Sequence, residues 1–88
     1  VLADIERDAL QAAHDALRET GAEVVAVPTD VGDPASVRAL ADRALEAFGQ
    51  IHLLCCNAGV CSRAGLIWEQ TPADWAWVFG VNVTGVAH

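Results

Sequence analysis

The strongest constraint on the fold is a repeated order of apolar run and amphipathic helix along the 88-residue chain. The apolar runs cover Val1–Ala3, Val24–Val27 and Ile51–Cys56. The second and third runs are almost continuously apolar, as in strands whose two faces are both covered by helices. The distance between successive runs accommodates one crossover helix and two short loops. The sequence therefore predicts βαβ units with a parallel sheet, in a single small α/β domain.

The two intervening segments carry helix signals. A first helix is predicted over Glu6–Glu19. The second has the more regular pattern, because apolar residues recur over Val37–Phe48 at the spacing of one helix face. Asp33 suits its N-cap, Pro34 its first turn, and Gly49 its end.

A third helix is expected from Thr71 onward, with Asp74 placed to complete a capping box. Within it, Asn82 is an amide in an otherwise apolar stretch. Because an unpaired buried amide is costly, Asn82 must face a polar pocket, a water or a partner group, or be a hydrogen-bonded core residue. The nearby tryptophans are interpreted as core or interface residues, with the wall of a substrate pocket as the alternative: Trp68, Trp75 and Trp77.

The composition argues against several classes of partner. Twelve acidic residues against five basic ones give a net charge of −7, opposite to what nucleic acid or an anionic membrane would select. A hydrophobic share of 53% favours a buried sheet over disorder. No apolar run reaches the roughly 18–20 residues of a membrane helix, and no signal-peptide pattern is present. A cytoplasmic protein is therefore predicted.

The cysteines and histidines give no sign of a metal site. Cys55, Cys56 and Cys61 contain no Cys-x-x-Cys pair, so neither zinc nor a disulfide framework is predicted. Cys55 and Cys56 are interpreted as small core residues on opposite faces of a strand. The histidines are interpreted as structural: His14, His52 and His88.

Polar or small residues follow each apolar run, where parallel sheets place their ligands. Asp4 suits the ribose hydroxyls of a dinucleotide, or the start of the first helix. Asp30 can accept from an amino group or a backbone amide, with Val31 packing on a flat ring; a turn aspartate is the alternative. Asn57-Ala58-Gly59 allow close approach of a ligand, and a tight turn explains them equally well.

Four motifs in this order resemble those of the short-chain dehydrogenase/reductase family. Val1-Leu2-Ala3-Asp4 is similar to the second strand with its acidic end, and Asp30-Val31 to the adenine-contacting pair. Cys56-Asn57-Ala58-Gly59-Val60 resembles the Asn-Asn-Ala-Gly motif, with Cys56 in place of the first asparagine. Val81-Asn82-Val83-Thr84-Gly85-Val86 resembles the segment that carries the catalytic asparagine. The resemblance extends over nearly the whole chain.

The resemblance implies a Rossmann-type doubly wound parallel sheet that is only partly present. Residues 1–88 would form a partial NAD(P)-binding domain with strands two to four and their helices, while strand one, which lies between strands two and four, would be absent. The glycine-rich turn would precede residue 1, and the catalytic serine and Tyr-x-x-x-Lys pair would follow residue 88. The sequence has no Tyr or Lys in their place, so the segment alone is expected to be inactive.

The resemblance also implies a function for the complete protein. It would transfer a hydride between nicotinamide and a secondary alcohol or ketone, with Asn82 holding the water of a proton relay. Asp4 would bind the ribose, Asp30 and Val31 the adenine, and Asn57–Gly59 the cofactor side of the sheet.

NAD is the favoured cofactor, because Asp4 is followed by Ile5 rather than by a basic residue, while Arg7 leaves NADP open. The loop Cys61–Trp68, which includes Arg63, is expected to line part of the substrate pocket, and the third helix to form a homo-oligomer interface. The alternative is a catalytically inactive dinucleotide-binding relative, or a truncated interaction module that uses the third helix and its tryptophans.

Overall fold

Two short parallel strands form the sheet. The computed structural model describes residues 1–62 and 64–88, and in it β1 (Leu2–Asp4) pairs with β2 (Ala26–Pro28). The register joins Leu2 to Ala26 and Asp4 to Pro28. The N–H of Leu2 also donates to the Val25 carbonyl at 2.8 Å. This pairing confirms the parallel βαβ unit predicted from the first two apolar runs.

Helix α1 (Arg7–Glu19) connects the two strands and packs on both of them. Glu6 is its N-cap residue. The side chain of Leu10 is buried. The rest of α1 is largely exposed and includes both charged side chains and Leu17, which is 40% exposed. There the hydrogen bond with His14 lowers the pKa of the Asp15 carboxyl. Leu10 is therefore the one side chain that α1 buries, while the helix packs on both strands.

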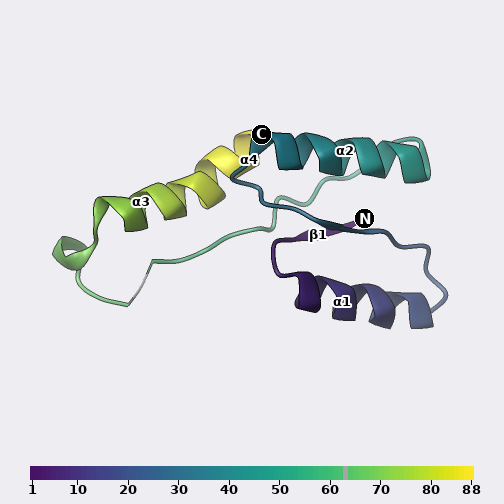
Figure 1. Ribbon diagram of the computed structural model, residues 1–88, viewed down its shortest axis with the longest axis horizontal. Helices are drawn as coiled ribbons and strands as arrows, with labels where there is room; N and C mark the ends of the chain where they lie inside the picture. The colour runs from purple at the N-terminus through teal and green to yellow at the C-terminus, as the bar shows by residue number, and fades with distance from the viewer. Residues whose placement is uncertain (63) are drawn as a thin grey trace.

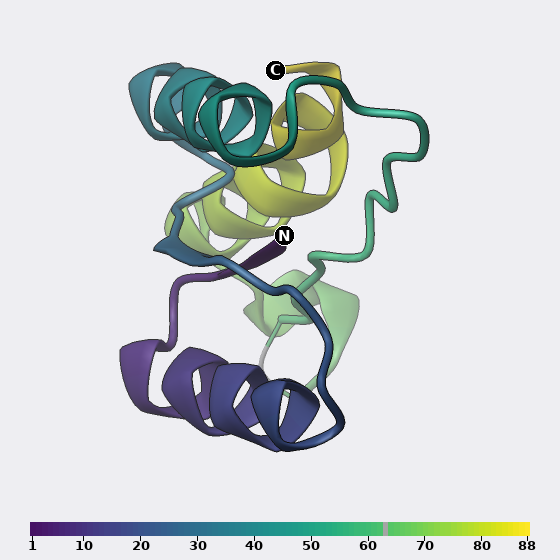
Figure 2. The same ribbon diagram turned by 90° about the vertical axis from the view of Figure 1, so that its right-hand side faces the viewer.

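Helix α2 (Pro34–Phe48) begins and ends at the predicted residues. The Asp33 side chain accepts a hydrogen bond from the Ala35 N–H at 2.9 Å, and Pro34 occupies the first turn. Gly49 ends the helix in the left-handed region at φ 77°, a conformation that favours glycine. Figure 2 shows α1 and α2 on opposite sides of the two strands. Helices therefore flank the sheet on both faces, as predicted.

The strand predicted over Ile51–Cys56 is not formed. This segment pairs with no strand in the described part of the chain, and Figure 1 shows it as an irregular connection after α2. A strand needs a neighbour for its backbone N–H and C=O groups. β1 has a single paired neighbour, β2, and no other strand of the described residues pairs with its second edge. The interpretation of Cys55 and Cys56 as core residues is likewise wrong, because both are exposed.

The third predicted helix is present and changes type along its length. It follows a short 3₁₀ turn, η1 (Ile67–Glu69), and consists of α3 (Pro72–Phe79), the π-helical segment η2 (Gly80–Thr84) and α4 (Gly85–Ala87). Thr71 and Asp74 form the predicted capping box. In the described part of the chain, no helix is long and apolar enough to cross a membrane.

Much apolar surface is exposed. The accessible surface is 6635 Å², against roughly 4,900 Å² for a compact monomer of this mass. The radius of gyration is 15.2 Å, whereas a compact domain of this length has about 12 Å. Trp68 is 77% exposed, and Trp75 and Trp77 are also exposed. These tryptophans are therefore not core residues of this chain, which leaves an interface or the wall of a pocket for them.

We expect the 88-residue chain by itself not to hold this arrangement stably. Its buried apolar residues are few among those described, namely Leu10 and Ala44, and β1 has an unpaired edge. Amide hydrogen exchange by NMR checks this prediction. We expect a poorly dispersed spectrum and rapid exchange outside the helices, whereas well-dispersed signals with slow exchange in β1 and β2 would overturn it.

Candidate functional site

The carboxyl ends of β1 and β2 bring Asp4 and Asp30 to one edge of the sheet. The N–H of Thr29 donates to the Asp4 carbonyl at 2.9 Å, which extends the strand pairing one residue beyond β2. Thr29 is 4% exposed, and its hydroxyl donates to the Val27 carbonyl at 2.9 Å. A buried, hydrogen-bonded residue therefore joins the ends of the two strands and fixes where Asp30 leaves the sheet.

The Asp4 carboxylate is partly committed to the backbone. Its Oδ1 accepts a hydrogen bond from the Glu6 N–H at 2.9 Å, just before α1. The alternative interpretation, that Asp4 caps the first helix, is wrong, because the N-cap residue is Glu6 and no side chain caps α1. The bond to the Glu6 N–H instead forms a local turn before the helix. Oδ2 has no hydrogen-bond partner among the described residues, and the side chain is exposed. The carboxylate is therefore oriented by the backbone and still able to accept from a ligand.

Asp30 is held in a similar way. Its Oδ1 accepts from the Gly32 N–H at 2.8 Å, so the interpretation as a turn aspartate is correct for this oxygen. Its own N–H donates to the Ser36 hydroxyl of α2 at 3.0 Å. We did not single out Ser36 or Thr29 from the sequence. A signal was available for Ser36, because a hydroxyl in the first turn of a helix can reach the preceding loop.

The Asn82 side chain joins the C-terminal helix to the loop that follows the third apolar run. Its Oδ1 accepts from the Val60 N–H at 2.8 Å, and its Nδ2 donates to the Val60 carbonyl at 2.8 Å. Val60 directly follows Asn57-Ala58-Gly59, and a Cβ placed on Gly59 would lie 3.6 Å from Asn82 Oδ1. Of the environments considered for Asn82, the structure shows a partner group, the Val60 backbone.

The helix changes to π geometry where Asn82 lies. The segment η2 spans Gly80–Thr84, and π segments are rare and frequent at functional sites. The only sign of this segment in the sequence was the polar Asn82 within an apolar stretch. A side chain that binds a distant loop through two hydrogen bonds is consistent with this local change in helix geometry.

The same helix also contacts the loop after β2. Gly85 lies against Val31, and the Nδ1 of His88 lies 2.9 Å from the Val31 carbonyl oxygen. Asn82 and Gly85 are three residues apart on this helix. They contact the loops at Val60 and Val31, which are far apart in the sequence. Together with the Asp4–Thr29 bond, these contacts link the ends of β1 and β2, the loop at Val31 and the loop at Val60.

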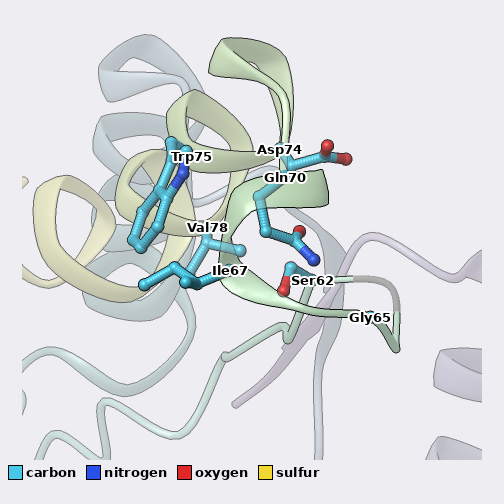
Figure 3. Close-up of a pocket in the computed structure, with 7 residues that line it drawn as sticks. All are labelled: Ser62, Gly65, Ile67, Gln70, Asp74, Trp75 and Val78. Carbon is cyan, nitrogen blue, oxygen red and sulfur yellow. The ribbon is translucent and has the colours of Figure 1, made fainter.

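A separate pocket of about 220 Å³ lies beside the start of α3 (Figure 3). Trp75, Ile67 and Val78 form its apolar wall, and Figure 3 shows the Asp74 carboxylate pointing away from it. Ser62, Gly65 and Ile67 belong to the loop expected to line a substrate pocket, whereas Arg63 lies outside the described residues. None of the residues predicted to bind a nucleotide lines this pocket.

A parallel sheet flanked by helices, with acidic side chains at the carboxyl ends of adjacent strands, is typical of the class of Rossmann-type nucleotide-binding folds. The family model of the short chain dehydrogenases matches residues 1–88. This chain belongs to the short-chain dehydrogenase/reductase family, as its motifs predicted.

Known relatives and solved structures agree with this assignment. The chain is 39% identical over 89 residues to 1-deoxy-11-beta-hydroxypentalenate dehydrogenase of Streptomyces avermitilis, covering 100% of this chain and 33% of that protein. A short-chain dehydrogenase/reductase of Burkholderia phymatum, solved in complex with NAD, is 60% identical with a TM-score of 0.95, covering 99% of this chain and 31% of the other. NAD⁺-bound xylitol dehydrogenase is 33% identical with a TM-score of 0.93, covering 99% and 34%.

These comparisons confirm the predicted fold class, a Rossmann-type α/β sheet that is present in part. The chain spans about a third of the length of the relatives that it matches. The family model describes short chain dehydrogenases, and the relatives named above are dehydrogenases or members of that family.

Proposed function

We propose that this chain is the adenosine-binding part of an NAD-dependent oxidoreductase that transfers a hydride between nicotinamide and a secondary alcohol or ketone. Residues 1–88 would be part of its NAD(P)-binding domain. The observation that carries the proposal is the connection of the site residues. Asp4 ends β1 and Asp30 follows the end of β2, and the C-terminal helix contacts the loop at Val60 through Asn82 and the loop at Val31 through Gly85.

The residues present fit the adenosine half of a dinucleotide. Asp4 has an oriented carboxylate with one uncommitted oxygen, which suits the hydroxyls of the ribose. Its charge opposes a 2′-phosphate, which favours NAD over NADP. Asp30, whose carboxylate is oriented by Gly32, would accept from the adenine amino group, with Val31 beside the ring. Asn57-Ala58-Gly59 bring small residues where the backbone can approach the cofactor.

When bound, NAD would supply the hydride acceptor. In this proposal Asn82 holds a water of the proton relay. The Oδ1 and the Nδ2 of Asn82 each make one hydrogen bond to the Val60 backbone. A side-chain amide has two donor hydrogens and two acceptor lone pairs, so one of each is left. Asn82 can therefore bind a water while it keeps the Asn57–Val60 loop in place.

Two finer features belong to the same proposal: a cytoplasmic protein, and a homo-oligomer that pairs through the third helix. Trp75, Trp77 and Phe79 of α3 are 45–52% exposed, and Val83 and Val86 continue this apolar surface. A surface of this kind is typical of an interface. The molar mass of the full-length protein in solution tests this feature, and a monomer would contradict it.

The test of the proposed function uses the full-length protein that contains this chain. We expect NAD to be reduced in the presence of at least one member of a panel of secondary alcohols, and the coding sequence downstream of residue 88 to contain a Tyr-x-x-x-Lys motif. NAD binding without turnover on any alcohol, and without that motif, would favour the inactive relative. A stop codon directly after residue 88 would favour the truncated interaction module, and absence of NAD binding would contradict the cofactor site.

A further inference from the structure

Val31 packs so closely on Gly85 that a side chain has no room there. A Cβ placed on Gly85 would lie 2.9 Å from Val31 Cγ2 and 3.2 Å from both Val31 Cβ and the Val31 carbonyl oxygen. One of these atoms belongs to the backbone, so a change of the Val31 rotamer would not relieve the whole contact. The backbone of Gly85 is ordinary helix at φ −62°. The glycine is therefore needed for close approach and not for its conformational freedom.

Gly80, at the start of the π segment η2, has different surroundings. A Cβ placed on Gly80 would meet nothing within 4 Å, and its φ of −57° is also helical. The two glycines thus differ in what surrounds them and hardly at all in backbone conformation. The close approach to the loop is specific to Gly85.

His88 adds a polar contact on the same side of the helix. Its Nδ1 lies 2.9 Å from the Val31 carbonyl oxygen. Because a carbonyl oxygen only accepts, Nδ1 is the donor in the tautomer that carries its hydrogen there. Residues three apart lie on the same side of a helix. Gly85 and His88 therefore hold the side chain and the carbonyl of Val31 from one helical turn.

The loop that they contact carries the proposed adenine-binding residues. Asp30 precedes Val31, and its carboxylate and N–H are held by Gly32 and Ser36. The loop is thus held from α2 on one side and from the C-terminal helix on the other. The same helix carries Asn82 three residues before Gly85.

We propose that Gly85 and His88 are positioning residues that hold the Asp30–Val31 loop where it can receive the adenine of the cofactor. This inference rests on the proposed function. The two residues act through Val31 and touch no cofactor themselves. Through them, the helix that carries the proposed relay residue also sets the position of the adenine-binding loop.

The test compares Gly85→Ala with Gly80→Ala in the full-length protein. Gly85→Ala would push Val31 and its backbone outward, so we expect the Kd for NAD to rise by about fivefold or more, with kcat at saturating NAD changed much less. Gly80→Ala, the matched control, should leave the Kd for NAD unchanged. Equal NAD affinity in wild type and Gly85→Ala would overturn the inference.

Two further variants distinguish a moved loop from a damaged fold. Val31→Ala removes the Cγ2 atom nearest to the added methyl, so Gly85→Ala should weaken NAD binding less in that background than in wild type. His88→Ala removes a hydrogen bond without adding atoms, and it should weaken NAD binding in the same direction. No rescue by Val31→Ala together with an unchanged Kd in His88→Ala would contradict the positioning role.

A measurement without cofactor separates this inference from the proposed function. In the ligand-free protein, the amide of Gly32 should exchange with solvent faster in Gly85→Ala than in Gly80→Ala, because its bond to Asp30 would be disturbed. If wild type fails to bind NAD but this difference is found, the proposed function fails and the loop contact stands. If wild type binds NAD and the two variants are alike in exchange and affinity, the inference fails alone.

Discussion

Replacing Asp4 with Ala is expected to weaken NAD binding by the full-length protein by about one to two orders of magnitude, the range for hydrogen bonds to a charged group. The ribose would lose the carboxylate that the Glu6 N–H orients. NADP binding should change little or improve, because the charge that opposes a 2′-phosphate is gone. Calorimetric titration of both cofactors measures the two effects together.

Two variants serve as controls for this prediction. Asp4→Asn keeps an oxygen that can accept from the Glu6 N–H but removes the charge, so it should lose the preference for NAD while the turn remains intact. Asp8→Ala removes the same charge from the exposed first turn of α1 and should leave both affinities nearly unchanged. A Kd for NAD in Asp4→Ala equal to that of wild type would refute the role of Asp4.

The second large effect is expected for Asn82→Ala, with a loss of about 100-fold or more in kcat, the lower range for removing a group from a proton-transfer relay. This variant removes both hydrogen bonds to Val60 as well as the proposed binding position for the water. The KM for NAD should change much less than kcat. Steady-state kinetics of the full-length protein at saturating NAD make this comparison.

Thr84→Ala is the matched control for Asn82→Ala, because it shortens an exposed side chain in the same π segment. It should keep nearly the wild-type kcat. Asn82→Ala is also expected to destabilise the protein, by about 1–2 kcal/mol for the two lost hydrogen bonds. If Thr84→Ala lost as much activity as Asn82→Ala, the effect would lie in the helix as a whole and not in the Asn82 amide.

The helices and the first strand pair were predictable because their signals are local. Asp33, Pro34 and Gly49 bound α2 through capping chemistry that depends on residues close in the sequence. The absence of a strand over Ile51–Cys56 could not be predicted in this way. A strand requires hydrogen bonds from a neighbouring strand, and the apolar run does not specify that neighbour. The exposure of Trp68, Trp75 and Trp77 could not be predicted for a similar reason, since an apolar pattern does not identify what covers it.

The site was predictable in its residue types and less so in its contacts. The rule that polar residues follow parallel strands pointed to Asp4 and Asp30, and the structure places both at one edge. The partners of these side chains were not foreseen. The contact of Val31 with Gly85 and the two bonds between Asn82 and Val60 join residues far apart in the sequence. Such contacts depend on how the helix packs, which no local pattern determines.

The most direct test of the cofactor site is a crystal structure of the full-length protein with NAD bound. We expect the adenosine ribose hydroxyls within hydrogen-bond distance of the Asp4 carboxylate and the adenine edge at Asp30, beside Val31. An adenosine bound elsewhere, with Asp4 and Asp30 both facing solvent, would contradict the proposed site.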